Sequence, residues 1–312
     1  MAMAAFKHSD TLLNRLPTVR GLYQVNADLR GRSWFRTGGP AEVLFEPADA
    51  EDLQLFLAER PGDVPVTVIG FGSNLLVRDG GIDGVVVVLG DAFTTVAFDG
   101  TTVTAGAAAL DVNVARAARD KGVAGLEFLS GIPGTIGGAI RMNAGAYGGE
   151  IADVAVDATV LDDEGGAHVM NTCRLNFSYR HSAVPEGWVA ISARLLGEPG
   201  NPGEIADRMA AIATMRGESQ PRTRTGGSTF ANPPGRKAWE LIEQAGCRGL
   251  RRGGAMVSEQ HCNFLLNTGT ATSSDLELLG EEIRCRVLEK TGVHLEWEIR
   301  RIGRSPRGGE MQ

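Results

Sequence analysis

The sequence predicts an α+β protein built from two domains. Short apolar strands and amphipathic helices occur in both halves of the 312-residue chain, separated by loops dense in glycine. Residues 197–203 read Gly-Glu-Pro-Gly-Asn-Pro-Gly, and we expect this stretch to hold no regular structure and to link the domains. A chain of this length can bury a core in each domain.

The N-terminal part shows a series of short strand patterns and two helix patterns, after a stretch at 9–16 that could form a further short helix. Asp49 can cap the first helix, and Asp99-Gly100 between two apolar runs predicts a hairpin. Residues 125–149 contain too much glycine and proline for a long helix or strand, so we expect a loop with a short helix at most. The expected strands are 41–45, 66–69, 85–89, 94–98, 102–105, 154–161 and 189–196, and the expected helices are 50–60 and 111–121.

The C-terminal part is expected to mix three helices with two strands. The last strand alternates, with Glu296, Glu298 and Arg300 on one face and apolar side chains on the other. The helices are expected at 204–216, 237–245 and 274–291, and the strands at 263–267 and 295–302. The expected parts are an N-terminal extension (1–20), a first domain (21–198, with lobes of about 21–90 and 91–198), a linker (199–203), a second domain (204–303) and a tail (304–312).

Composition argues against several classes of partner. The net charge of −7 is unsuited to a broad nucleic-acid surface. No run of about 18 apolar residues occurs, and the N-terminus lacks the pattern of a secretory signal. The four cysteines are scattered without a C-x-x-C pair, which argues against a zinc site. We therefore expect a cytoplasmic monomer with no metal, no nucleic-acid partner and no membrane partner.

Two glycine-rich loops are the strongest candidates for ligand binding. The first, Gly70 to Asn74, follows a predicted strand, and its backbone N–H groups could face an anion; a tight structural turn is an equal alternative. The second spans Ser130 to Ala139 and continues through Asn143 to Gly148. Neither is a Walker loop or a G-x-G-x-x-G motif. Two separate glycine loops indicate one extended diphosphate held from two sides.

Together these loops resemble the flavin-binding domain of vanillyl-alcohol-oxidase-like flavoproteins. The resemblance implies FAD held between two small α+β lobes, followed here by a C-terminal α+β substrate domain. The cofactor contacts that it implies are Gly70, Gly72, Ser73, Asn74, Ser130, Ile132, Gly134, Thr135, Gly137 and Gly138.

Three further motifs follow the glycine loops in order. They are Tyr179-Arg180-His181-Ser182, the stretch from Gly226 to Pro233 that reads GGSTFANP, and Glu298-Ile299-Arg300. Each alone is more simply read as a turn or a solvated strand face. In this order the set resembles the family of UDP-N-acetylenolpyruvoylglucosamine reductases, over residues 30–303.

That resemblance implies a mechanism. NADPH reduces FAD, and the reduced flavin then delivers hydride to the enol ether of a UDP-sugar, a small-molecule substrate of peptidoglycan precursor synthesis. Arg180 and a protonated Glu298 would stabilise the charge that develops on the substrate, and Ser228 would donate the proton. The substrate contacts that it implies are Tyr179, Asn232, Lys237 and Arg300.

The sequence departs from the better-known branch of that family, which closes over substrate with a tyrosine on an inserted loop. Only a short stretch separates Ser182 from the 189–196 strand here, so the chain resembles the branch without the insertion. Ala231 also stands where many relatives have lysine. Two other classes stay open: a flavin oxidase of the same fold, and a non-catalytic dinucleotide-binding module. His261 could orient an anion or pack beside the 263–267 strand.

Overall fold

The computed structural model describes residues 12–306, which form two compact units. The first contains 12–25, 43–71 and 84–216, and the second contains 26–42, 72–83 and 217–306. The expected features at 1–11 and 307–312, parts of the N-terminal extension and of the tail, lie outside the described residues. The division into units differs from a single boundary at 199–203, because β4 (Leu75–Val77) pairs in parallel with β19 (Arg300–Ile302).

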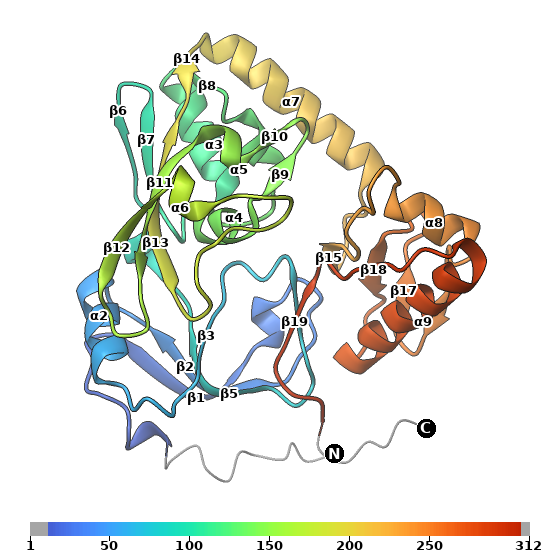
Figure 1. Ribbon diagram of the computed structural model, residues 1–312, viewed down its shortest axis with the longest axis horizontal. Helices are drawn as coiled ribbons and strands as arrows, with labels where there is room; N and C mark the ends of the chain where they lie inside the picture. The colour runs from blue at the N-terminus through green and yellow to red at the C-terminus, as the bar shows by residue number, and fades with distance from the viewer. Residues whose placement is uncertain (1–11, 307–312) are drawn as a thin grey trace. The chain divides into compact units, whose positions relative to one another are not determined.

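The first strands of the chain form a four-stranded sheet with the order β1-β2-β5-β3 (Figure 1). Helix α2 begins where the Asp49 carboxylate accepts a hydrogen bond from the Asp52 N–H, which confirms the predicted cap. Its apolar face joins the core beneath the sheet through Leu53, Phe56 and Leu57. The bounds are β1 (Leu22–Asp28), β2 (Pro40–Glu46), α2 (Ala50–Glu59), β3 (Val66–Val68) and β5 (Ile82–Val87).

A second, antiparallel sheet has the order β12-β11-β13-β7-β6 and belongs to the first unit. Strands β6 and β7 form the predicted hairpin, and Gly100 at its turn has a positive φ of 58°. Short helices around this sheet bury a core that includes Val103, Leu129 and Ile140. The bounds are β6 (Val96–Asp99), β7 (Thr102–Gly106), α3 (Asp111–Asp120), η3 (Glu127–Gly131), α4 (Ile136–Met142), β9 (Gly145–Ala146), β10 (Gly149–Glu150), α5 (Ile151–Val154), β11 (Ala155–Leu161), β12 (Ala167–Asn171), α6 (Thr172–Leu175) and β13 (Val189–Leu196).

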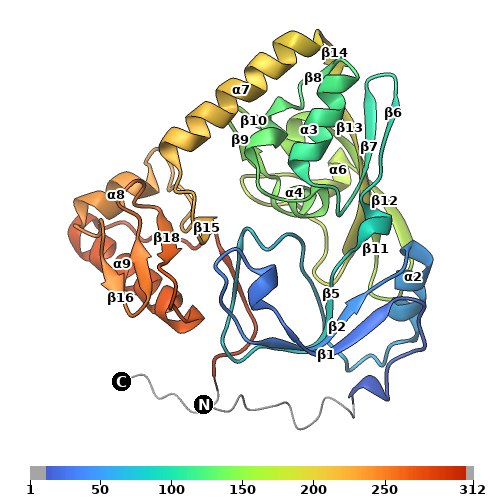
Figure 2. The same ribbon diagram turned by 180° about the vertical axis from the view of Figure 1, so that it is seen from behind.

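The stretch at 197–203 is not irregular, so that expectation was wrong. Glu198–Pro199 forms β14, which pairs with β8 (Val123–Ala124), and α7 (Pro202–Ser219) begins three residues later. The Asn201 side chain accepts the Gly203 N–H over 2.8 Å and so caps the helix. Proline is well tolerated at the first position of a helix, which is why this Pro-Gly stretch starts α7 instead of breaking it. Figures 1 and 2 show α7 as one uninterrupted helix.

The second unit contains an antiparallel sheet with the order β15-β18-β17-β16 and the helices α8 and α9 (Figure 2). Helix α9 starts with a capping box between Thr272 and Asp275 and ends at Gly292, whose φ is 70°. Its apolar face shares a core with α8. The bounds are β15 (Thr225–Ser228), α8 (Ala238–Gln244), β16 (Arg251–Arg252), β17 (Ala255–Val257), β18 (Phe264–Asn267) and α9 (Ser273–Thr291).

The last strand is shorter than expected, because only Arg300–Ile302 forms a ladder. Residues 295–299 instead lie along the segment after β15, with one isolated bridge between Phe230 and Trp297. The expected alternation still holds at both ends of the stretch, since Leu295 and Ile299 are buried while Glu296 and Arg300 are exposed. Among the described residues, no helix combines the length and hydropathy needed to cross a bilayer.

Candidate active site

The two glycine loops meet at Thr135 in the first unit. A Cβ atom built on Gly70 would lie 3.0 Å from the Thr135 hydroxyl, and one built on Gly138 would lie 3.9 Å from the same oxygen. Both glycines are exposed, whereas Thr135 itself is buried. The structure thus brings together one glycine of each predicted loop, with their backbones open to a ligand.

Other glycines of the second loop serve packing. A Cβ on Gly131 would overlap the Tyr147 ring at 2.4 Å, one on Gly137 would lie 3.0 Å from the Ala107 Cβ, and one on Gly134 would lie 2.8 Å from an Asp111 carboxylate oxygen. The Ser130 hydroxyl donates to the Glu127 carbonyl. Close backbone approach therefore explains these three glycines without any ligand.

The first loop continues into the second unit, where its residues hold other backbone segments. Gly72 has a φ of 71°, and a Cβ there would lie 2.0 Å from the Arg32 carbonyl oxygen. The structural-turn interpretation is therefore correct at this position. The Asn74 side-chain amide donates to the Glu298 carbonyl over 3.1 Å, while Ser73 is half-buried.

Arg180 lines an open hollow of about 380 Å³ in the first unit, together with Gly145, Tyr147, Glu150 and Tyr179. Its guanidinium donates to the Gly145 carbonyl over 2.9 Å and lies 5.1 Å from the centre of the Tyr179 ring. The φ of Arg180 is 55°, in the left-handed region that costs a non-glycine residue free energy. This strain, beside a hollow, is typical of a residue held for function.

Tyr147 is a further candidate site residue, which sequence reasoning did not select. It also has a positive φ, 54°, and lines both the Arg180 hollow and a second one of about 360 Å³ beside α7. Its hydroxyl is buried without a hydrogen-bond partner among the described residues, and burial raises its pKa. The signal in the sequence was a tyrosine enclosed by glycines, at Gly145-Ala146-Tyr147-Gly148.

Asp111 was missed as well. It is fully buried at the start of α3, and neither carboxyl oxygen has a hydrogen-bond partner in the described structure. Burial raises the pKa of this carboxyl well above its usual range, which favours the neutral acid. Its main-chain N–H donates to the Gly134 carbonyl, so it lies directly behind the second glycine loop. Sequence reasoning took Asp111 only as the start of a helix.

Ser228 and Glu298 are brought together through Thr229 in the second unit. Ser228 ends β15 opposite Phe264 and is half-buried. The Glu298 N–H donates to the carbonyl of Thr229, the next residue, over 2.9 Å. Glu298 is also half-buried. The two candidate catalytic side chains of this unit therefore come from neighbouring, hydrogen-bonded segments.

The expected substrate contacts of the second unit are exposed. The Asn232 carboxamide oxygen accepts the Ala238 N–H at the start of α8. Its NH₂ group donates to no other described residue, and Lys237 is the residue before that helix. The Arg300 N–H donates to the Asn74 carbonyl over 3.0 Å. His261 lies edge-on to Phe264, 4.8 Å between ring centres, so packing explains it.

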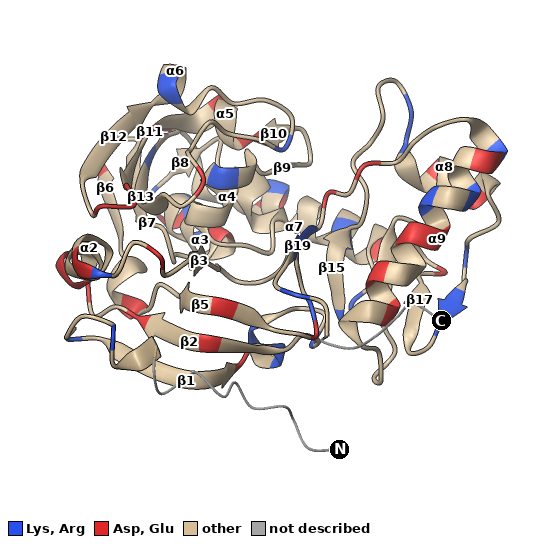
Figure 3. Cartoon of the chain, turned by 60° about the horizontal axis from the view of Figure 1, so that its bottom comes forward, with Lys and Arg blue, Asp and Glu red and all other residues tan. Residues whose placement is uncertain are grey.

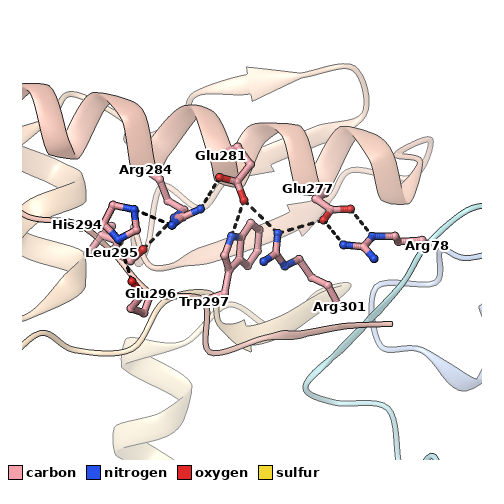
Figure 4. A network of polar contacts seen from close by, with 9 residues as sticks. All are labelled: Arg78, Glu277, Glu281, Arg284, His294, Leu295, Glu296, Trp297 and Arg301. Atoms are coloured by element: carbon pink, nitrogen blue, oxygen red, sulfur yellow. Dashed lines mark hydrogen bonds and ion pairs between the residues drawn. The ribbon is translucent and has the colours of Figure 1, made fainter. Parts of the chain in front are cut away.

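A network of polar contacts joins helix α9 to the segment on either side of Glu298 (Figure 4). Helix α9 carries acidic residues along its length (Figure 3). Arg301 contacts Glu277 at 3.1 Å and Glu281 at 3.0 Å, and the Trp297 indole N–H donates to Glu281 over 2.8 Å. Arg78 forms a bidentate pair with Glu277 and holds the pKa of that carboxyl below its usual range. Both neighbours of the 298–300 segment are thereby anchored.

Comparisons with known proteins find relatives for both parts of the chain. Residues 41–171 match the family model of an FAD binding domain, and residues 220–302 match that of the C-terminal domain of UDP-N-acetylenolpyruvoylglucosamine reductase. The reductase of that name from Parvibaculum lavamentivorans is 58% identical, over 98% of this chain and 100% of its own length. The one from Paramagnetospirillum magneticum is 59% identical, over 96% and 98%. The crystal structure of MurB from Thermus caldophilus superposes with a TM-score of 0.78 at 36% identity, covering 91% of this chain and 99% of that one.

The fold and the glycine loops define a flavin-dependent oxidoreductase of the α+β class, with an FAD-binding domain and a C-terminal substrate domain. The chain belongs to the UDP-N-acetylenolpyruvoylglucosamine reductase family. The resemblance drawn from the ordered motifs is therefore confirmed, as are the fold class and the flavin cofactor.

Proposed function

We infer that this chain reduces the enolpyruvyl ether of UDP-N-acetylglucosamine to UDP-N-acetylmuramate, with electrons from NADPH passing through FAD. The observation that carries the inference is the hydrogen-bonded pairing of the Ser228 and Glu298 segments, in a chain that matches its reductase relatives over nearly its whole length. An oxidase or a simple dinucleotide-binding module gives no reason for that pairing.

The residues around Thr135 fit a dinucleotide. Gly70 and Gly138 leave their backbones open beside the Thr135 hydroxyl, and a side chain at either position would occupy that surface. We propose that these residues, with Ser73, Ser130 and Ile132 of the same loops, hold FAD. When bound, FAD accepts two electrons from NADPH and supplies hydride to the substrate double bond.

Arg180, Glu298 and Ser228 would handle the charge and the proton that the substrate carries through the reaction. Hydride addition leaves negative charge on the substrate carbon next to the carboxylate. The Arg180 guanidinium and a protonated Glu298 are suited to stabilise it, because both donate hydrogen bonds to an oxyanion. A proton from the Ser228 hydroxyl to that carbon would complete the product.

Exposed groups in each unit suit the diphosphate and the sugar. Lys237 and Arg300 supply positive charge, and the Asn232 NH₂ group can donate a hydrogen bond. Tyr179 lies against Arg180 in the open hollow and can contact the substrate there. Six residues, 183–188, join Ser182 to β13, which supports the branch of the family without an inserted tyrosine loop. We further propose that the protein works as a monomer in the cytoplasm.

Anaerobic visible spectroscopy tests this function directly. The purified protein should be yellow, bleach with NADPH and recover its colour when the UDP-enolpyruvyl sugar is added. A protein that recovers its colour with oxygen and ignores the sugar would be an oxidase instead. A protein that cannot be loaded with FAD would contradict the assignment of the glycine loops.

A further inference from the structure

Asn263 fastens the segment that follows Ser228. Its side-chain oxygen accepts the Phe230 N–H over 2.9 Å, and its side-chain NH₂ donates to the Phe230 carbonyl over 2.8 Å. Its main-chain carbonyl accepts the Thr229 N–H over 2.7 Å. Only 4% of Asn263 is exposed, so water competes little for these three bonds.

The Asn263 side chain supplies hydrogen bonds to Phe230 that the sheet itself does not provide. The register between β15 and β18 shifts between Thr225 and Ser228, and the last pair of the ladder joins Ser228 to Phe264. A carboxamide has the same donor and acceptor as a peptide group. Beyond that pair, the Asn263 main chain holds Thr229 with one bond, and the Asn263 side chain holds Phe230 with two more.

The opposite edge of the same segment carries Glu298. The Thr229 carbonyl accepts the Glu298 N–H over 2.9 Å, and the Ala231 N–H donates to the Glu296 carbonyl over 2.9 Å. Residues 228–231 thus lie between Asn263 on one side and the Glu296–Glu298 stretch on the other. A displacement of Phe230 would move both Ser228 and Glu298.

From this geometry we infer that Asn263 is the positioning residue for Ser228 and Glu298 together. It acts through main-chain bonds to Thr229 and Phe230, not through the substrate. The inference rests on the proposed roles of Ser228 and Glu298. Displacement of a catalytic group by about 1 Å can slow the chemical step by about a hundredfold, so the loss of one Asn263 bond should be measurable in the rate.

Asn267 provides a matched control at the other end of β18. It is also 4% exposed, and its side-chain NH₂ donates to the Phe35 carbonyl over 2.7 Å. Its side-chain oxygen accepts the N–H groups of Gly269 and Ala271. At either position, Asn→Asp keeps the shape of the side chain and its accepting oxygen. It removes the one hydrogen bond that the side-chain NH₂ group donates to a main-chain carbonyl. The two substitutions should therefore cost similar stability, but only one acts on Ser228.

The experiment follows the two half-reactions separately in holoenzyme by anaerobic stopped-flow absorbance. For Asn263→Asp we expect flavin reduction by NADPH at the wild-type rate, and recovery of colour with the UDP-enolpyruvyl sugar slower by about 10- to 100-fold. The solvent deuterium isotope effect on that second step should rise, because proton delivery becomes limiting. Asn267→Asp should change the second step by less than about twofold, within the effect of a remote substitution.

Equal rates for the second step in the two Asp variants, slowed or not, would overturn the inference. Ser228→Ala in the same assay separates the inference about Asn263 from the proposed function. If the second step is unchanged in Ser228→Ala, Ser228 is not the proton donor, and the inference about Asn263 fails with that role. If an Asp variant does not retain flavin, Asn263→Ser and Asn267→Ser replace the pair without adding charge. A slower second step in the Asn263 variant alone then supports the inference, and equal rates in the two Ser variants overturn it.

Discussion

The Asn74 carboxamide donates a hydrogen bond to the Glu298 carbonyl over 3.1 Å, and the Asn74 carbonyl accepts the Arg300 N–H over 3.0 Å. One residue of the first glycine loop thus holds the chain on both sides of Ile299. Asn74 was expected to contact the cofactor, yet its donor points to the segment that carries the candidate acid.

Replacing Asn74 by alanine should separate these two roles. The variant loses one hydrogen bond, about 1 kcal/mol, from the support of Glu298. We expect it to keep its flavin, while the substrate-dependent recovery of flavin colour slows severalfold. Flavin content and stopped-flow absorbance measure the two effects. Weak flavin binding with a normal second step after saturation with FAD would instead assign Asn74 to the cofactor.

Gly138 tests the location of the flavin. A Cβ there meets nothing closer than 3.9 Å, so Gly138→Ala should fold normally, and helix propensity alone would stabilise α4 by up to about 1 kcal/mol. If FAD lies against this backbone, the added methyl group should weaken FAD binding by about tenfold or more, about 1.4 kcal/mol. Fluorescence titration of apoprotein with FAD measures it.

Gly203→Ala in the first turn of α7 is the control, since a Cβ there approaches only the Asn201 side chain. Its FAD affinity should equal that of the wild type. A Gly138→Ala protein with the same affinity as this control would place the cofactor elsewhere.

Asp111 should make the protein less stable as the pH rises. Burial raises its folded pKa, so above an unfolded pKa of about 3.9 the unfolded chain loses this proton while the folded one keeps it. The free energy of unfolding then falls by up to about 1.4 kcal/mol per pH unit, until the folded pKa is reached. Asp111→Asn removes this dependence on pH, because asparagine has no carboxyl group that ionises.

Urea unfolding at several pH values compares the wild type with Asp111→Asn. The variant should gain stability over the wild type as the pH rises from about 4, and the gain should level off above the folded pKa of Asp111. Asp207→Asn, an exposed position on α7, should show a constant difference. A constant difference for Asp111→Asn as well would mean that the carboxyl ionises normally in the folded protein.

The Arg78–Glu277 pair should act in the opposite direction. Arg78 lowers the folded pKa of Glu277, so the pair stabilises the protein above the unfolded pKa of about 4.3 and stops doing so as the pH falls through the folded value. Glu277→Gln should cost stability at neutral pH and little at about pH 3. Thermal unfolding of both proteins across this range measures the difference, with Glu289→Gln, an exposed residue of α9, as the control. A loss of stability that does not vary with pH would contradict the ionic role.

Much of this protein could be predicted from the order of local patterns. The hairpin at Asp99-Gly100, the cap at Asp49 and the two glycine loops depend on residues close together in the chain, and each appears where expected. The motifs at Arg180, Ser228 and Glu298 were enough to indicate the reductase family, since several spaced motifs in one order rarely occur by chance.

Only the tertiary structure decided which neighbours each residue has. The sequence cannot show that Asn74 holds Glu298 or that Asn263 holds Phe230, because these relationships join residues distant in the chain. Nor can it show that the Asp111 carboxyl lies buried without a hydrogen-bond partner among the described residues, because packing of distant segments encloses it. The start of α7 was mistaken for a linker because Pro and Gly break a helix interior but are accepted at its first turn. Local chemistry determined which residues are candidates, whereas packing between distant segments determined which of them bind and which of them support the others.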